Sequence, residues 1–216
     1  MDVSELRTLI SEGENFKIEF KRQFSSVEKI AKELIAFANT KGGMILFGVD
    51  DDGTIYGVES EKSETDLIYE AAHGFCEPPI EPIVQVIELN RKDIVVAIVE
   101  ESPTKPHRLQ DYKNSVSRDA KVYIRVHDKS VIASREVVKI LESESPNGKP
   151  LSIIIGENER RLFKYLEDKQ RVTVKDFAKL VNISERRAGR ILVNLVRAGV
   201  IRIHTEEKFE YFTSAF

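Results

Sequence analysis

The 216-residue sequence predicts an α+β protein: a mixed sheet with packed helices, followed by a small helical domain that ends in a hairpin. Helical periodicity alternates with short apolar runs over most of the chain. The segment Ser143–Ser152 is rich in Ser, Pro and Gly and almost lacks apolar residues, as linkers do. We therefore expect a first domain over residues 1–144, a linker over 145–156 and a second domain over 157–216.

The composition is that of a globular protein, with 41% hydrophobic and 32% charged residues. No stretch approaches the ~20 apolar residues of a membrane-spanning helix, and the N-terminal sequence lacks the basic start and apolar centre of a secretory signal. Cys76 is the single cysteine, so no disulfide framework is predicted. We expect a cytoplasmic protein with no membrane partner.

The first domain opens with a helix and a strand that are readable from their periodicity. Apolar residues on one side of residues 3–11 predict a short helix. Apolar and charged residues alternate over 16–21, which predicts a half-buried strand with Glu19 on the face opposite the Phe side chains. Residues 27–38 repeat apolar side chains at three- and four-residue spacing, so a second helix follows.

The stretch AFANTKGGMILFGVDDDGTIYG, residues 36–57, organises the first domain. It predicts a helix end, a glycine break, a buried strand over MILFGV and a tight acidic turn into a second strand over TIYGV. Asp52-Gly53 favours a hairpin turn at this point, because both residues accept a positive φ. Further elements are expected in order: a helix over 63–76, strands over 83–89 and 94–99 joined by a loop over 90–93, a surface loop over 102–114, a strand over 122–126 and a helix from Arg135.

The second domain predicts three helices and a β-hairpin. Thr173 and Ser184 can cap the second and third helices, and Gly199 ends the third. The sequence IRIHTEEKFEYF then alternates around residues 206–208, as a hairpin does.

Three motifs of the first domain resemble one known family. They are ENFKIEFK at residues 14–21, the stretch over 36–57 and YIRVHDKSVIAS at residues 123–134. Together they are similar to the Schlafen-type AlbA-like domain of prokaryotic transcriptional regulators. The resemblance implies a DNA-binding regulator with a mixed sheet and packed helices. The order of elements in the second domain resembles a winged helix-turn-helix.

The third helix of the second domain is the predicted DNA-binding element. Its apolar positions follow helical spacing and should pack inward, whereas Ser184, Arg186, Arg187 and Arg190 lie in its first turns. In a helix-turn-helix, this part of the helix enters the major groove of double-stranded DNA. Lys208 of the hairpin is a further candidate contact, and a homodimer is expected by analogy with such regulators.

The charge distribution agrees with this placement. Residues 1–150 hold 20 Lys and Arg against 27 Asp and Glu, whereas residues 151–216 hold 13 against 9. A nucleic acid should therefore be attracted most strongly to the C-terminal part. A solvated basic face on a protein-binding adaptor is the alternative explanation.

A metal-dependent endoribonuclease is a second alternative, and it comes from the resemblance. Some Schlafen relatives cleave RNA with two glutamates five residues apart and a later aspartate. Glu14 and Glu19 have this spacing, and Asp50 matches the third position best, with Asp51 and Asp52 left open. Under this alternative the carboxylates would hold Mg²⁺ or Mn²⁺ and RNA would be a partner. Otherwise no cofactor is expected.

Two weaker candidates complete the sequence-based hypotheses. Basic residues of the first domain could contact nucleic acid locally: Lys17, Lys21, Arg22, Arg118, Lys121 and Arg125. His73 and Cys76 have the spacing of a half zinc site, but the chain has no second cysteine to complete four ligands. We therefore expect Cys76 to be a buried structural residue.

Overall fold

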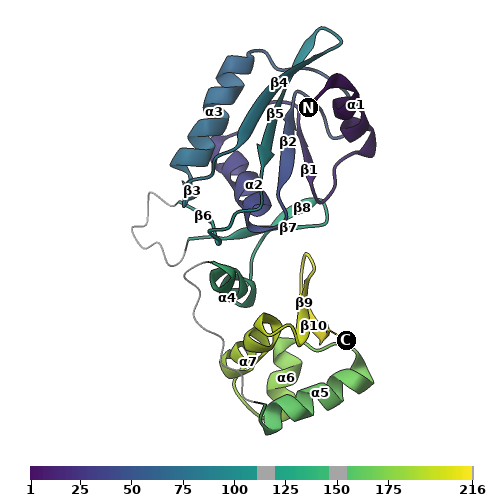
Figure 1. The fold of residues 1–216 in the computed structure, drawn as a ribbon, viewed down its shortest axis with the longest axis vertical. Coiled ribbons are helices and arrows are strands. Elements are labelled where there is room, and N and C mark those ends of the chain that lie inside the picture. The colour runs from purple at the N-terminus through teal and green to yellow at the C-terminus, as the bar shows by residue number, and fades with distance from the viewer. Residues whose placement is uncertain (111–119, 146–154, 216) are drawn as a thin grey trace. The chain divides into compact units, whose positions relative to one another are not determined.

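The computed structural model describes residues 1–110, 120–145 and 155–215. The chain divides into two compact units, Met1–Ala133 and Ser134–Phe216, which we call unit 1 and unit 2 (Figure 1). A mixed sheet with packed helices forms unit 1, so the α+β prediction is confirmed. Among the helices of these residues, none is both long enough and apolar enough to cross a membrane.

A four-stranded sheet forms the centre of unit 1, in the order β1-β2-β5-β4. β1 (Ile18–Lys21) pairs in parallel with β2 (Gly43–Phe47). β5 (Lys92–Val99) pairs antiparallel with β2 and with β4 (Ile83–Leu89). Helix α2 (Val27–Asn39) connects the two parallel strands, because a parallel pair needs a crossover.

The two faces of this sheet carry separate apolar clusters, because side chains alternate along each strand. Ile45 packs in the cluster that contains α2 and α3 (Glu61–Gly74). Leu46 packs in the opposite cluster with α1 (Val3–Glu12). The same alternation puts Glu19 of β1 on the α2 side, away from the phenylalanine that follows it, as predicted.

Two short strand pairs complete unit 1. β3 (Cys76–Glu77) pairs with β6 (Arg108–Leu109), and β7 (Tyr123–Val126) pairs with β8 (Lys129–Ile132). Helix α2 packs against β7. The buried Asn39 amide at the end of α2 donates a hydrogen bond to the carbonyl oxygen at the start of β7 at 3.0 Å, which fixes the hairpin against the helix.

The strand predicted over TIYGV is reduced to a single bridge between Val49 and Ile55. Gly48, with φ +96°, lies directly against Gly57. A Cβ placed on Gly48 would come within 2.9 Å of the Gly57 backbone. The chain therefore leaves the sheet at Gly48, and the two glycines allow the close crossing.

The loop predicted over residues 90–93 is a two-residue turn at Asn90 and Arg91. Both residues have positive φ values, 56° and 61°. Two-residue hairpin turns favour this conformation because it matches the twist of the strands. Lys92 and Asp93 consequently belong to β5.

Unit 2 contains the predicted three helices and hairpin. They are α5 (Glu157–Lys169), α6 (Val174–Val181), α7 (Glu185–Arg197) and the antiparallel strands β9 (Ile201–Thr205) and β10 (Glu210–Ser214). Thr173 and Ser184 cap α6 and α7 as predicted, each accepting a bond from an amide of the first turn. One apolar cluster joins these elements.

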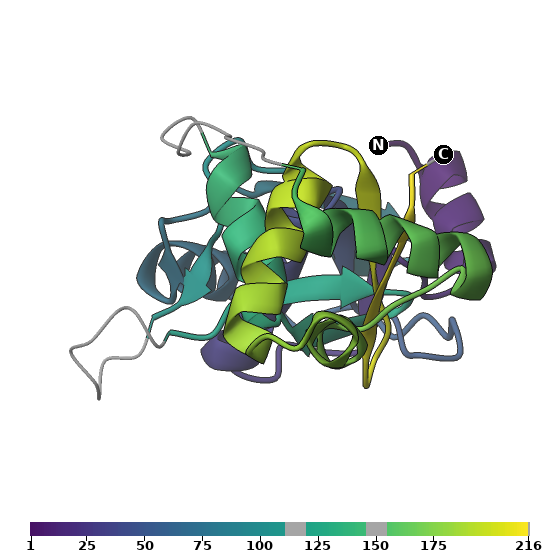
Figure 2. The ribbon, with the colours of Figure 1, turned by 90° about the horizontal axis from the view of Figure 1, so that it is seen from below.

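Helix α4 (Arg135–Glu144) belongs to unit 2, whereas the sequence places it at the end of the first domain. It lies beside α7 (Figures 1 and 2). Gly189 of α7 allows this approach: a Cβ there would come within 2.5 Å of a carboxylate oxygen of Glu136. The boundary between the units therefore falls at 133/134, and residues 146–154 of the expected linker lie outside the described residues.

Candidate nucleic-acid interface

Three arginines at the start of α7, Arg186, Arg187 and Arg190, are exposed, and we call them the arginine cluster. The Ser184 hydroxyl caps the helix by accepting a hydrogen bond from the Arg187 amide at 3.3 Å. Within residues 1–110, 120–145 and 155–215, no carboxylate pairs with these three guanidinium groups. Their charge is therefore free to meet an external anion.

The packing of α7 explains why the arginine cluster points outward. Ala188, Leu192 and Leu195 are buried in the apolar cluster of unit 2. Gly189, on the neighbouring side of the helix, packs against Glu136 of α4. The arginines occupy the remaining side, because helical residues three and four apart share a face.

Lys208 lies at the tip of the β9–β10 hairpin and is exposed. Beside it, Phe209 is 54% exposed, and its ring stacks on Tyr211 with 6.0 Å between centroids. Tyr211 stacks in turn on His204, its cross-strand partner, at 4.8 Å. This aromatic row was not predicted from the sequence. Phe209 and Tyr211 are two residues apart on one strand and so share a face, which is the signal that could have found it.

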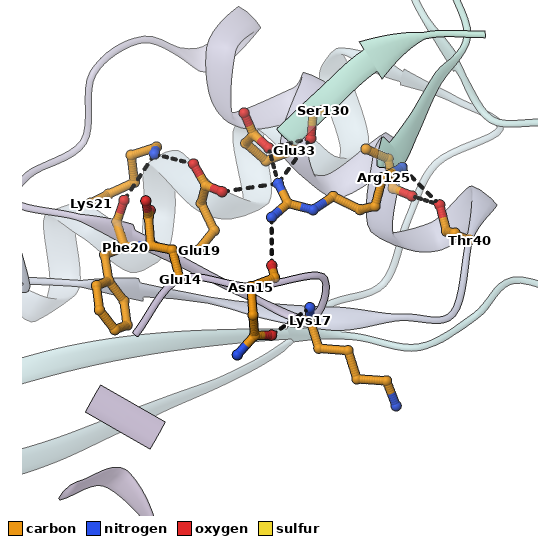
Figure 3. A network of polar contacts seen from close by, with 11 residues as sticks. Glu14, Asn15, Lys17, Glu19, Phe20, Lys21, Glu33, Thr40, Arg125 and Ser130 are labelled. Carbon is orange, nitrogen blue, oxygen red and sulfur yellow. Dashed lines mark hydrogen bonds and ion pairs between the residues drawn. The ribbon is translucent and has the colours of Figure 1, made fainter. Parts of the chain in front are cut away.

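A buried ionic network forms around Arg125 of β7 in unit 1 (Figure 3). The Arg125 side chain is 0% exposed. Its Nη1 donates to Glu19 Oε2 at 2.9 Å and to Glu33 Oε2 at 3.2 Å, and its Nη2 donates to the Asn15 carbonyl oxygen at 2.9 Å. The Ser130 hydroxyl of β8 donates to the same Glu33 oxygen.

Lys21 completes the network from the other side of Glu19. Its ammonium donates to Glu19 Oε1 and to the Phe20 carbonyl oxygen, the latter at 2.8 Å. Both oxygens of Glu19 are therefore bonded by cations of the chain itself. Glu14 lies next to Glu19 and Lys21, and its Oε1 accepts a hydrogen bond from the Phe20 amide at 2.9 Å.

The carboxylates of the nuclease alternative are only partly brought together. Burial raises the pKa of Glu14, and the charges of Glu19 and Asp51 raise this pKa further. Asp50 instead lies 3.9 Å from Arg22 Nη1. Across the described ranges, no three His, Cys, Asp or Glu side chains are grouped so that they could hold a metal ion. The residues present do not fit the metal site that the resemblance implies.

The basic residues suggested as contacts in the first domain have different surroundings. The suggestion is wrong for Arg125, because its guanidinium is buried and bonded to carboxylates. Lys21 is also engaged by Glu19, whereas Lys17, Arg22 and Lys121 are exposed. The remaining candidate, Arg118, lies outside the described residues.

His73 and Cys76 have separate environments. His73 Nε2 lies 3.0 Å from Glu81 at the surface. Cys76 is buried, its thiol donates to the Ala71 carbonyl oxygen at 3.4 Å, and burial raises its pKa to about 12. A protonated, enclosed thiol is a poor metal ligand, since the thiolate is the ligating form.

Glu33 gives the network a dependence on pH. Burial raises the pKa of Glu33, and the nearby Glu19 charge raises it further, against the Ser130 hydrogen bond and the Arg125 charge. Because the pKa of Glu33 is higher in the folded state, the folded state binds more protons than the unfolded state at pH values between the unfolded and the folded pKa.

We therefore expect the stability of the wild type, relative to Glu33→Gln, to fall as the pH rises from the ordinary carboxyl value through the folded pKa of Glu33. Above that pKa the difference should stay constant. Urea unfolding of both proteins at a series of pH values measures it. A difference that grows with rising pH would contradict the assignment.

Comparison with known proteins gives one family match. The family is Schlafen, AlbA_2, and it matches residues 14–134. Among solved structures, the DIP2311 protein from Corynebacterium diphtheriae is 15% identical, with a TM-score of 0.48; the match covers 69% of this chain and 33% of that chain. The N-terminal domain of a RecG-related protein from Nitrosomonas europaea is 22% identical, with a TM-score of 0.43, over 59% of this chain and 90% of that one. No curated protein matched.

This chain thus corresponds to about a third of the length of the first structure. The family match extends from the loop before β1 to the end of the β7–β8 hairpin, and so includes the whole sheet and the Arg125 network. It covers more than half of the 216 residues. The chain belongs to the Schlafen, AlbA_2 family.

Proposed function

We propose that the protein is a transcriptional regulator that binds double-stranded DNA through unit 2. The observation that carries this proposal is the arginine cluster, which is exposed and without carboxylate partners in the described part of the chain. At the start of a recognition helix, arginine pairs with the O6 and N7 atoms of guanine or binds phosphates. The cluster has the residue type and the position that such contacts need.

The connection between α6 and α7 supports a helix-turn-helix. α6 ends at Val181, and Asn182 adopts a left-handed conformation with φ 54°. Ser184 then caps α7, so the two helices are separated by a short turn. The β9–β10 hairpin follows in the place of a wing. We therefore propose that unit 2 is a winged helix-turn-helix domain.

In this proposal α7 makes the main contact and the hairpin a minor one. Lys208 can bind a phosphate from the hairpin tip, but Glu206 and Glu207 precede it directly. Two carboxylates beside one ammonium weaken attraction to a polyanion. Regulators of this architecture read two-fold sites as dimers, so we propose a cytoplasmic homodimer that needs no cofactor to bind DNA.

Replacing Arg186, Arg187 and Arg190 together by Ala is expected to lower the affinity for duplex DNA by about 100-fold or more, since each such arginine contributes about 1–3 kcal/mol. The logarithmic salt dependence should also become shallower, by about 0.9 for each phosphate that the variant no longer neutralises. Fluorescence anisotropy on a pool of duplexes, at several salt concentrations, measures both effects.

The matched control removes the same charge from another helix of unit 2. Arg160, Lys164 and Lys169 of α5 are exposed, so their triple Ala variant should keep the affinity within a few-fold. Equal losses in the two variants would mean that only net charge matters. Unchanged affinity in the α7 variant would defeat the proposal and favour a protein-binding adaptor.

RNA cleavage is not part of this proposal. Glu19, which the nuclease alternative needs as a ligand, is already bonded by Lys21 and Arg125. An RNA duplex added as competitor in the anisotropy experiment tests whether unit 2 prefers DNA. A DNA-reading α7 should favour the wide major groove of B-form DNA, because the major groove of RNA is too narrow for a helix.

A further inference from the structure

Unit 1 brings three carboxylates and two cations together in one network: Glu14, Glu19, Glu33, Lys21 and Arg125 (Figure 3). The cations bond both carboxylate oxygens of Glu19, which a metal ion at this position would need as ligands. Lys21 Nζ bonds Glu19 Oε1, and Arg125 Nη1 bonds Glu19 Oε2 at 2.9 Å. Neither Glu19 oxygen can turn toward a new ligand without breaking a charge-assisted hydrogen bond.

We infer that Lys21 and Arg125 take the place of a divalent cation, so that the native protein binds no metal ion at Glu14 and Glu19. With all five groups ionised, the network carries a net charge of about −1. A divalent ion entering it would meet two positive charges at close range, and buried like charges repel strongly. Metal binding would first require that Lys21 leaves Glu19.

The network has a structural role that explains its burial. β7 and β8 form their own two-stranded sheet and share no ladder with the four-stranded sheet. Arg125 of β7 bonds Glu19 on β1, and Ser130 of β8 bonds Glu33 on α2. Ion pairs and side-chain hydrogen bonds therefore hold the β7–β8 hairpin to β1 and α2, which strand pairing does not do. Glu19 acts here as an anchor of the hairpin.

The two cations differ in how easily they can be removed. The Lys21 side chain is 25% exposed, whereas that of Arg125 is 0% exposed. Solvent therefore reaches the Lys21 side chain but not the Arg125 side chain. Lys21→Met keeps the apolar stem, removes the charge and leaves one oxygen of Glu19 unbonded beside Glu14. This variant should gain a divalent-cation site.

The test measures Mn²⁺ binding to the full-length protein by electron paramagnetic resonance, together with the Mn²⁺-dependent shift of thermal unfolding. The wild type and the matched control Lys17→Met, an exposed lysine four residues earlier, should show no stoichiometric binding. Lys21→Met should bind one Mn²⁺ at least about tenfold more tightly than the wild type and be stabilised by it. Adding Glu14→Gln should remove that gain.

Two results would overturn the inference. One is stoichiometric Mn²⁺ binding by the wild type that Glu19→Gln abolishes. The other is a folded Lys21→Met protein that gains no Mn²⁺ affinity, since the ammonium would then not occupy a cation position. If Lys21→Met does not fold, Lys21→Gln replaces it, and Mn²⁺ binding and the Mn²⁺-dependent shift of thermal unfolding are measured on that variant. Neither result depends on DNA binding by unit 2.

Discussion

Arg125→Met is expected to lower the free energy of unfolding of unit 1 by about 3–5 kcal/mol, the usual cost of removing one partner from a buried ion pair. Met fills part of the space of the side chain but leaves Glu19 with Lys21 alone and Glu33 with the Ser130 hydroxyl alone. The Asn15 carbonyl oxygen also loses the Arg125 donor and keeps the Ile18 amide at 3.4 Å. Since domains are stable by only about 5–15 kcal/mol, the loss is a large fraction of the total.

Amide hydrogen exchange of β2 and β5 measures this loss in unit 1 alone, and urea unfolding followed by circular dichroism gives the global effect. Lys121→Met is the matched control, because Lys121 is an exposed cation just before β7. It should change the stability by less than about 0.5 kcal/mol. A loss below about 1 kcal/mol in Arg125→Met would show that the network does not hold the hairpin.

A double variant separates two contributions to the loss of stability in Arg125→Met: the lost hydrogen bonds and the Glu19 carboxylate left without its buried partner. Adding Glu19→Gln to Arg125→Met should recover part of the lost stability, because it removes a carboxylate that no longer has its buried partner. Additive effects of the two substitutions would contradict a direct interaction, since residues in contact show a coupling energy.

The sequence could predict the part of this site that depends on local alternation. Glu19 alternates with apolar residues over 16–21, and the prediction that it faces away from the phenylalanines is confirmed for Phe20. Its partner could not be predicted. Arg125 follows 106 residues later and lies on a strand whose four residues are all buried, so alternation gives no sign of a charge inside.

The acidic turn shows a similar limit. Asp50, Asp51 and Asp52 are consecutive, and the family resemblance favours Asp50 as the third carboxylate beside Glu14 and Glu19. In the structure the charge of Asp51 acts on Glu14, while Asp50 lies near Arg22. The direction of each side chain in a turn depends on backbone angles such as those at Gly48. A match to a sequence motif does not specify these angles.

Helix α7 was readable because its signals are local. Ser184 caps it, apolar residues repeat at helical spacing, and Gly199 follows its end with φ 70°. Helix α4 was equally readable as a helix, but its assignment to a domain depends on a tertiary contact. The fit of Glu136 against Gly189 brings together residues of two helices, and neither helix shows it by itself.

The fragment 134–216 is expected to unfold at a temperature at least about 10 °C higher than the fragment 157–216. Helix α4 carries three buried apolar side chains, Val137, Ile140 and Leu141, and it packs on α7. Their burial should contribute about 2–4 kcal/mol after the cost of ordering the helix. In a domain of this size, 1 kcal/mol shifts the melting temperature by about 4–8 °C.

Differential scanning calorimetry of the two fragments measures this difference. In the longer fragment, Leu141→Asp should reproduce the lower melting temperature, because a charge at a buried position prevents α4 from docking. Arg135→Ala, at an exposed position of the same helix, should not. Equal melting temperatures of the two fragments would show that α4 does not stabilise unit 2, and would support its assignment to the first domain, as the sequence suggests.

Helix α4 directly follows the family domain in the chain. β8, the last strand of the family domain, ends at Ile132, and α4 begins at Arg135. The chain therefore passes within three residues from the hairpin that Arg125 holds to a helix that packs on α7. If α4 contributes to the stability of unit 2, as the two fragments test, then unit 2 begins directly after the β7–β8 hairpin and not after residues 146–154.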